Sequence, residues 1–347
     1  MRIRLQHSLL FLFSLCALLL GATVQADDSL PLRKLTLAGP AAGVSNGLIH
    51  LVESGSLSDL ADEVEFVLWS NPDQLRALTL AGNADFLAVP TNVAANLYNR
   101  GVPLQLLNVS QWGVLWMISR DDSKRTLADF KGEEIAIPFR ADMPDIVFSH
   151  LAEKQGINPK KDFRLNYSAT PMDAMQLLVM RRVDHALLSE PAVSMALRKT
   201  KSFPISIIAP ELHRSVDLQQ EWGRLMGTEA RIPQAGIAVL GDIRNHPELV
   251  QRFAEAYQQA NQWCLEHTEA CGKEVARHIK LLQADAVGDA MQAQNRHFAD
   301  AAQAREELED FYRILLEKQP ASVGGKLPDD DFYFTGNAEQ ASGADGQ

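Results

Sequence analysis

Apolar and polar residues alternate along the chain in two successive series of short strands and helices. The first series predicts strands at 35–38, 64–69 and 85–89 and helices at 48–57, 72–81 and 92–98. The second predicts strands at 134–137, 164–167 and 185–188 and helices at 145–155, 172–181 and 191–198. Strands that alternate with helices favour a parallel sheet covered on both faces. The doubled pattern therefore predicts an α/β protein with two lobes.

The C-terminal third is different in character and predicts long amphipathic helices that pack on a lobe. Their apolar positions are Leu249, Phe253, Tyr257 and Ala260, and later Leu308, Phe311, Tyr312 and Leu315. Residues 326–347 are rich in Gly, Ala, Asp and Ser and have no periodicity, which predicts a flexible tail. Within it, the aromatic run 332–334 could instead dock on the body.

The N-terminus has the features of a cleavable export signal. Arg2 and Arg4 precede an uncharged apolar run from residue 9 to residue 20, and small residues follow it up to Ala26. The run is about a dozen residues long, whereas a membrane-spanning helix needs roughly 20. We therefore expect cleavage after Ala26, a signal peptide at 1–26, a periplasmic location and no stable membrane insertion.

The net charge argues against two classes of partner, and the chain length bears on the number of lobes. The formal net charge is −11 over 347 residues. Nucleic acids and anionic membranes both attract basic surfaces, so neither is an expected partner. A chain of this length exceeds the usual size of a single core, which agrees with two lobes.

Two cysteines remain after the signal segment, Cys264 and Cys271. In an oxidising compartment such a pair usually forms a disulfide. On one continuous helix the two residues would lie about 10 Å apart, too far for a disulfide, so a bridge requires the helix to break near residues 266–268. The alternative is a metal site that adds His267, but it has no fourth ligand nearby in the sequence.

The motif with the strongest catalytic pattern is Gly43-Val44-Ser45-Asn46-Gly47, which fits the G-x-S-x-G nucleophile elbow. One interpretation of this motif is a secreted serine hydrolase with Ser45 as nucleophile. The alternative is a tight turn whose glycines let the backbone approach a ligand. Phosphate-loop, dinucleotide and H-E-x-x-H motifs are absent from the sequence. We therefore expect no enzyme activity, no cofactor and no metal.

Five stretches, in this order, resemble the periplasmic binding proteins of nitrate, sulfonate, taurine and bicarbonate ABC importers, a family that includes binders of thiamine-pyrimidine precursors. They are HLVESGSLSDLADEVEFVLW (50–69), QLRALTLAGNADFLAVPTNVAANLYNRGVPLQLL (74–107), TLADFKGEEIAIP (126–138), MDAMQLLVMRRVDHALLSEPAVSMAL (172–197) and GIAVLGDIRNHPELVQRFAEAYQQANQW (236–263). Individually these motifs are weak, but their order is specific.

The resemblance implies the type II periplasmic-binding fold, with two α/β lobes and a ligand cleft between them. Two crossovers would fall near residues 114–122 and 232–240. Lobe one would comprise 33–116 and 240–325, and lobe two 117–239. The implied function is solute binding for an ABC importer, with a small-molecule ligand, a permease and an ATPase as partners. The protein is expected to be a monomer, and a sensory or biosynthetic relative with the same fold is the further alternative.

Ligands of open α/β sheets bind beyond the carboxyl ends of the strands, beside helix starts. These positions give ten of the predicted ligand-binding residues: Ser45, Asn46, Trp69, Ser70, Thr91, Asn92, Arg140, Asp142, Met172 and Glu190. Gln111 and Trp112 are added because they lie near the expected hinge.

Arg140 and Asp142 occupy a turn where many relatives carry Gly and Ser. Helix-start amides favour an anion, and Arg140 could clamp it; alternatively, Arg140 pairs with Asp142 or Asp145 and only fixes the turn. Asp142 could be the cap of the next helix or a partner for an ammonium group. Trp69, Trp112 and Trp116 could stack a planar ligand or belong to the core.

Overall fold

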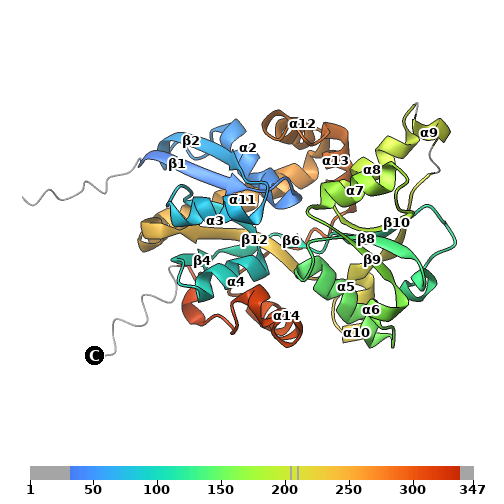
Figure 1. The fold of residues 1–347 in the computed structure, drawn as a ribbon. Coiled ribbons are helices and arrows are strands. Elements are labelled where there is room, and N and C mark those ends of the chain that lie inside the picture. The colour runs from blue at the N-terminus through green and yellow to red at the C-terminus, as the bar shows by residue number, and fades with distance from the viewer. Residues whose placement is uncertain (1–31, 204, 209–210, 337–347) are drawn as a thin grey trace, which may run out of the picture.

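The computed structural model describes residues 32–203, 205–208 and 211–336. Figure 1 shows two α/β lobes side by side, which confirms the predicted fold class. The predicted signal peptide at 1–26 lies outside the described residues. Among the residues that the structure describes, no helix has both the length and the hydropathy needed to cross a membrane.

Lobe one is built on a mixed sheet. Its strand order is β2 (Ala61–Leu68), β1 (Leu32–Gly39), β3 (Phe86–Pro90), β12 (Pro233–Leu240) and β4 (Leu104–Leu106), with β6 (Gln111–Trp112) also paired to β12. Strands β1, β2 and β3 run parallel, and β12 is antiparallel to its neighbours. Apolar side chains cover both faces of the sheet, from helices α2 (Asn46–Ser54) and α11 (Pro247–Glu266) on one and α4 (Thr91–Asn99) and α14 (Arg305–Lys318) on the other.

Lobe two repeats this plan. Its strand order is β11 (His213–Asp217), β7 (Leu115–Ser119), β10 (His185–Ser189), β8 (Glu134–Pro138) and β9 (Arg164–Ser168). Strand β8 is parallel to β9 and β10, whereas β7 is antiparallel to β10 and β11. One face packs against α5 (Met143–Lys154) and α10 (Leu218–Met226), and the other against α7 (Pro171–Val179) and α8 (Ala192–Lys201).

The remaining elements are connections and additions to these layers. They are η1 (Gly43–Ser45), α3 (Pro72–Leu80), β5 (Asn108–Val109), η2 (Leu127–Phe130), α6 (Pro159–Asp162), α9 (Ile205–Ile208), η3 (Gly241–Asn245), α12 (Thr268–His278), α13 (Ala284–Ala293), β13 (Ala299–Asp300), η4 (Pro320–Val323) and η5 (Asp330–Phe332).

The chain crosses between the lobes twice, and the two crossings lie next to each other. The first runs from β6 into β7 and the second from α10 into β12. The Gln234 side-chain oxygen accepts a hydrogen bond from the backbone N–H of Val114 at 3.1 Å, which ties the crossings together. Because all of β12 pairs within the first sheet, residues 233–239 belong with lobe one rather than with lobe two. The sequence predicted that lobe two ends at residue 239, which is near the end of β12. The structure places the return to lobe one before the start of β12.

Glycine is required at the first crossing. Gly113 has φ +76°, and a Cβ built there would lie 2.1 Å from the side chain of Gln219. Gln219 also accepts a hydrogen bond from the Leu115 N–H at 3.0 Å. The first crossing is therefore a short left-handed turn held against lobe two.

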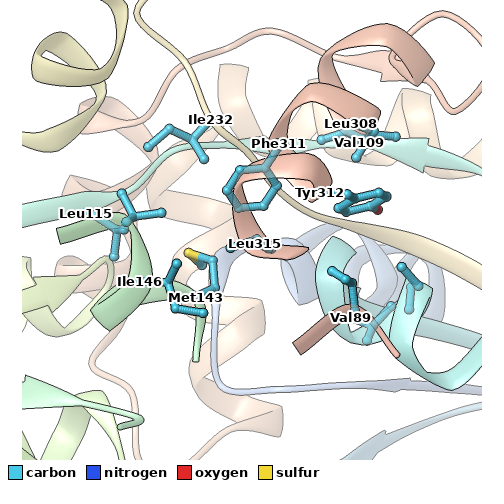
Figure 2. Close-up of a cluster of buried hydrophobic side chains, with 14 of the residues drawn as sticks. Val89, Val109, Leu115, Met143, Ile146, Ile232, Leu308, Phe311, Tyr312 and Leu315 are labelled. Carbon is cyan, nitrogen blue, oxygen red and sulfur yellow. The ribbon is translucent and has the colours of Figure 1, made fainter. Parts of the chain in front are cut away.

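Helix α14 joins the hydrophobic cores of the two lobes. Its Leu308, Phe311, Tyr312 and Leu315 are buried, as the apolar spacing predicts. Figure 2 shows Phe311 among side chains of both lobes, including Met143 and Ile146 from α5. Lys318 adds an ion pair to Glu153 at 2.7 Å. The C-terminal helix was expected on one lobe, but it bridges both.

The chain breaks helical geometry at His267, between α11 and α12. This break brings the Cα atoms of Cys264 and Cys271 to 5.1 Å, and a disulfide joins the two residues. No cluster of metal-ligating side chains is found in the described part of the chain. The structure thus has the bridge and the break that the cysteine spacing favours over a metal site.

The C-terminal segment docks on lobe one as far as residue 336. Phe332 and Tyr333 are buried, and the Phe334 N–H donates to the Leu106 carbonyl at 2.9 Å. Burial of two aromatic rings offsets the loss of chain entropy that would otherwise favour a free tail. Residues 326–336 are therefore not a flexible tail, and 337–347 lie outside the described residues.

Candidate ligand-binding cleft

A cavity of about 610 Å³ lies between the two lobes. Lobe one lines it with residues that follow the carboxyl ends of β1, β2 and β3, and lobe two with residues that follow β8, β9 and β10. The sheets face each other across the cavity with these strand ends, as expected for a ligand site in open α/β folds. The lining residues are 40–42, 68–71, 90, 92, 93, 139–144, 170–172 and 189–192.

The structure brings most of the predicted binding residues together at this cavity. Eight of them line it: Trp69, Ser70, Asn92, Gln111, Arg140, Asp142, Met172 and Glu190. Asn46 instead lines a small adjoining recess, together with Gln111 and Glu190.

Three predicted residues do not line the cavity. Ser45 is fully buried, and its hydroxyl donates to the Pro40 carbonyl at 2.7 Å, so it fixes the turn after β1. Thr91 is also buried, and its hydroxyl donates to the Pro233 carbonyl at 2.6 Å. The Trp112 ring lies in the core, where its Nε1 donates to the Val109 carbonyl at 2.9 Å.

The loop after β8 has an unusual backbone that presents Arg140. Phe139 and Ala141 have φ near +58° and +59°, a left-handed region that glycine adopts at no steric cost. The Arg140 guanidinium lies over the Tyr167 ring at 5.3 Å, and no ion pair links it to Asp142 or Asp145, all of which the structure describes. Arg140 is exposed, so its charge remains available at the cleft.

The two carboxylates of the cleft are already engaged by the protein. Asp142 caps α5 by accepting from the Met143 N–H at 2.7 Å, as one of the two sequence interpretations expects. Glu190 is buried, and its Oε1 lies 2.6 Å from Nη2 of Arg214. The second Glu190 oxygen accepts from the Ser194 N–H at 3.1 Å. The charge of Glu190 is therefore balanced by Arg214, whereas Asp142 is held by hydrogen bonds at the start of α5. Among the described residues, Arg140 has no carboxylate partner of the kind that Arg214 has.

Helix-start amides are less available than the sequence indicates. Asn71, Asp142 and Thr170 each accept hydrogen bonds from first-turn N–H groups of α3, α5 and α7. Proline near the start of each of these helices removes a further donor. The start of α4 has no side-chain cap. At α8, the Glu190 carboxylate already accepts from the first-turn N–H of Ser194. Of these five helices, α4 alone is therefore expected to offer free amides to an anion.

A family model described as NMT1/THI5 like matches residues 63–271, which is more than half of the chain. The chain belongs to this family. Comparison with curated protein sequences finds no match. The match covers most of the first segment of lobe one, from β2 onward, and the whole of lobe two. It also covers β12 and α11, where the chain returns to lobe one, so it includes most of the cleft of this NMT1/THI5-like protein.

Solved structures share the fold over nearly all of the described chain. An ABC transporter protein of Parabacteroides distasonis is 21% identical, with a TM-score of 0.71 over 86% of this chain and 98% of that one. The periplasmic nitrate-binding protein of Synechocystis PCC 6803 is 14% identical, with a TM-score of 0.65 and 84% of each chain covered. The periplasmic aliphatic sulphonate binding protein of Escherichia coli is 13% identical, with a TM-score of 0.62 over 86% and 92%. These likenesses confirm the binding-protein fold.

The serine-hydrolase interpretation of the G-x-S-x-G motif is not supported. The Ser45 hydroxyl is buried and points at the backbone of its own turn. A Cβ added at Gly39 would lie 2.2 Å from that hydroxyl oxygen, so the glycine allows Ser45 to close the turn. The motif of this NMT1/THI5-like protein therefore shapes the wall of the cleft.

Sequence reasoning missed the contribution of the C-terminal segment to the cleft. Gln319, Ala321 and Ser322 line the cavity, although they follow α14 at the far end of the chain. Asparagines on one face of α4 hold this segment: Asn92 and Asn96 donate to the carbonyls of Ser322 and Ala321. The i, i+4 spacing of these asparagines on a helix was the only sequence signal for the contact.

Proposed function

We propose that this protein is the exported solute-binding component of an ABC-type importer, which holds a small organic anion between its lobes and delivers it to a permease driven by an ATPase. The observation that carries the proposal is the cavity of about 610 Å³ between two lobes of a family member. Similar folds include proteins described as binding nitrate and aliphatic sulphonates. The proposal includes cleavage after Ala26, a periplasmic location, a monomer and no catalytic activity.

The charge at the mouth of the cleft supports an anionic ligand. Arg76, Arg100 and Arg140 are exposed and line the cavity. Of these, Arg76 lies 3.3 Å from Asp73, and both side chains are exposed, so that pair is weak. Of the two cleft carboxylates, Glu190 is paired with Arg214, which leaves Asp142 against three arginines. The local potential therefore favours an anion on a protein whose net charge is −11.

We propose that ligand binding closes the lobes by small rotations at the paired crossings. Each lobe supplies one wall of the cavity, so contacts to a ligand are complete only when the lobes approach. The crossings near Gly113 and Gln234 can absorb such rotations. The apolar core shared through α14 links the lobes on one side. We therefore expect the cleft to open and close on the opposite side.

Arg140→Ala tests the role of the anion clamp. A thermal-shift screen of small organic carboxylates and sulfonates is expected to find compounds that raise the melting temperature of the wild type. Loss of a charge-assisted contact typically costs about 2 to 5 kcal/mol, so Arg140→Ala should bind such a compound at least about 30-fold more weakly in calorimetry. Arg33→Ala, an exposed arginine on β1 outside the cleft, is the matched control. An affinity of Arg140→Ala within twofold of the wild type would remove Arg140 from the site.

A further inference from the structure

Helix α13 connects the two lobes at a place separate from the α14 contact. It packs against α12, which itself packs against α2 of lobe one. Its C-terminal end is tied to the first crossing, because Gln111 Nε2 donates to Gln294 Oε1 at 3.0 Å. Across the lobe boundary, α13 packs against α8 of lobe two. Figure 1 shows α13 and α14 on opposite sides of β6 and β12, so the lobes meet at two separate contacts.

The contact between α8 and α13 contains a network of ion pairs. Nε and Nη2 of Arg198 on α8 lie 2.5 and 2.9 Å from the two carboxylate oxygens of Asp289 on α13. The remaining nitrogen, Nη1, lies 3.3 Å from Asp285 Oδ2. The two aspartates are four residues apart on one helix, so they are neighbours on the same helix face. All three nitrogens of a lobe-two guanidinium are thus directed at carboxylates on α13, which packs with lobe one.

The surroundings of this network allow it to break and re-form. The side chains of Arg198 and Asp289 are 42% and 40% exposed, so water can solvate both charges when they separate. Near them, α8 and α13 contribute mainly small side chains to one buried apolar cluster, such as Ala196 and Ala286. Packed helices of this kind can slide by small amounts. By contrast, separation at α14 would expose the buried ring of Phe311, which is costly.

The lobes are drawn together in the arrangement described here, although the cleft holds only protein side chains at its edges. Asn92 of lobe one donates through Nδ2 to Asp142 Oδ1 of lobe two at 3.0 Å. A single hydrogen bond at a cleft that water can enter gives little net stabilisation. The contacts that flank the cleft must therefore contribute most of what holds the lobes in place, and the Arg198 network is the reversible one of the two.

We propose that Arg198, Asp285 and Asp289 form an ionic latch that holds the lobes together in the absence of ligand and releases when the cleft opens. This inference rests on the lobe movement proposed above and names the contact that controls it. A half-exposed two-armed pair with a second carboxylate contributes a factor of about three to five to the equilibrium between two lobe arrangements. The whole equilibrium lies within the folded state, so such a factor changes the two populations measurably.

Double electron–electron resonance on the ligand-free protein measures the separation of the lobes. Spin labels at Gln259→Cys on α11 and Gln176→Cys on α7 place one probe on each lobe at exposed positions. Labelling needs no reductant, so the Cys264–Cys271 disulfide stays closed. We expect mainly the distance that the arrangement described here gives, with a minor longer component. Raising the salt from about 0.05 M to about 1 M should increase the ratio of long to short distances about threefold, because salt screens half-exposed charges.

Variants assign the effect to the network. Arg198→Gln should raise the ratio of long to short distances about threefold to fivefold and make it less sensitive to salt. Asp289→Asn should act in the same way, and the double variant should do no more than either single one, because each already breaks the pair. Arg252→Gln is the matched control, because Arg252 makes the same two-armed pair with Asp59, at 2.9 and 3.1 Å, but within lobe one. It should leave the distances unchanged.

The outcomes separate the latch from the proposed function. Unchanged distances in Arg198→Gln and Asp289→Asn, or an equal change in Arg252→Gln, would overturn the latch. A wild type that already has the longer distance at low salt would overturn it as well. Each of these results leaves solute binding intact, since no ligand enters the measurement, whereas failure of the carboxylate and sulfonate screen would count against the proposed function. If Arg198→Gln does not fold, Asp289→Asn and the salt series decide the result.

Discussion

Opening the Cys264–Cys271 disulfide should destabilise the protein by a predictable amount. The bridge closes a short loop, with a sequence separation of 7. In the chain-entropy model, cross-linking a loop of this length lowers the entropy of the unfolded chain enough to stabilise the native state by about 2.5 kcal/mol at 25 °C. Both sulfur atoms lie in an apolar cluster with Val275 and Ile279, where free thiols are tolerated. Reduction should therefore remove the chain constraint with little change in packing.

The assay is urea unfolding of the purified protein with and without a phosphine reductant, followed by tryptophan fluorescence. We expect the reduced protein to lose about 2.5 kcal/mol of unfolding free energy, or about 4 °C of melting temperature for a chain of this size. The variant Cys264→Ala/Cys271→Ala, measured without reductant, should reproduce the loss and should not respond to the reductant. Equal stabilities of oxidised and reduced wild type, within about 0.5 kcal/mol, would refute the reasoning.

Two further predictions concern the shared core and pH. Phe311→Ala should destabilise the protein by about 3 to 5 kcal/mol in urea unfolding, because it opens a cavity in the core between the lobes, whereas Phe203→Ala, at a side chain 80% exposed, should change stability by less than about 0.5 kcal/mol. Burial lowers the pKa of His185 below its usual value, with Lys124 adding to the shift. The unfolded chain then binds more protons below about pH 6.5, so the unfolding free energy should fall as the pH drops below that value. His185→Gln should make this dependence shallower, and an unchanged slope would contradict the assignment.

The local pattern was sufficient to predict most elements, because a period of two or of 3.6 residues is a property of each segment alone. The strand β3 and the helix α4, for example, start within one residue of their expected positions. The pairing of β12 was not predictable in this way. Its eight residues are all buried, but an apolar run does not say which sheet it joins, and here the chain enters antiparallel from the other lobe.

The candidate site was predictable to the level of loops but not of individual side chains. Strand ends and helix starts mark the cleft, and Gln111, Arg140 and Glu190 do line it. Adjacent side chains on a strand point to opposite sides, however, so Trp112 enters the core where Gln111 faces the cleft. The segment at 319–322 reaches the cavity by tertiary packing of α14, and its only local sign in the sequence was the spacing of Asn92 and Asn96 on α4.

Native mass spectrometry on the protein incubated with an extract of small metabolites from its own cells tests ligand binding in the cleft most directly. The matched control is Ser70→Trp, which places a bulky side chain at an exposed cleft position without altering the buried core. We expect the wild type to retain one organic anion in a one-to-one complex that is released on unfolding, and Ser70→Trp to retain none. Retention of no small molecule by the folded wild type, or equal retention by Ser70→Trp, would contradict a solute-binding role for this cleft.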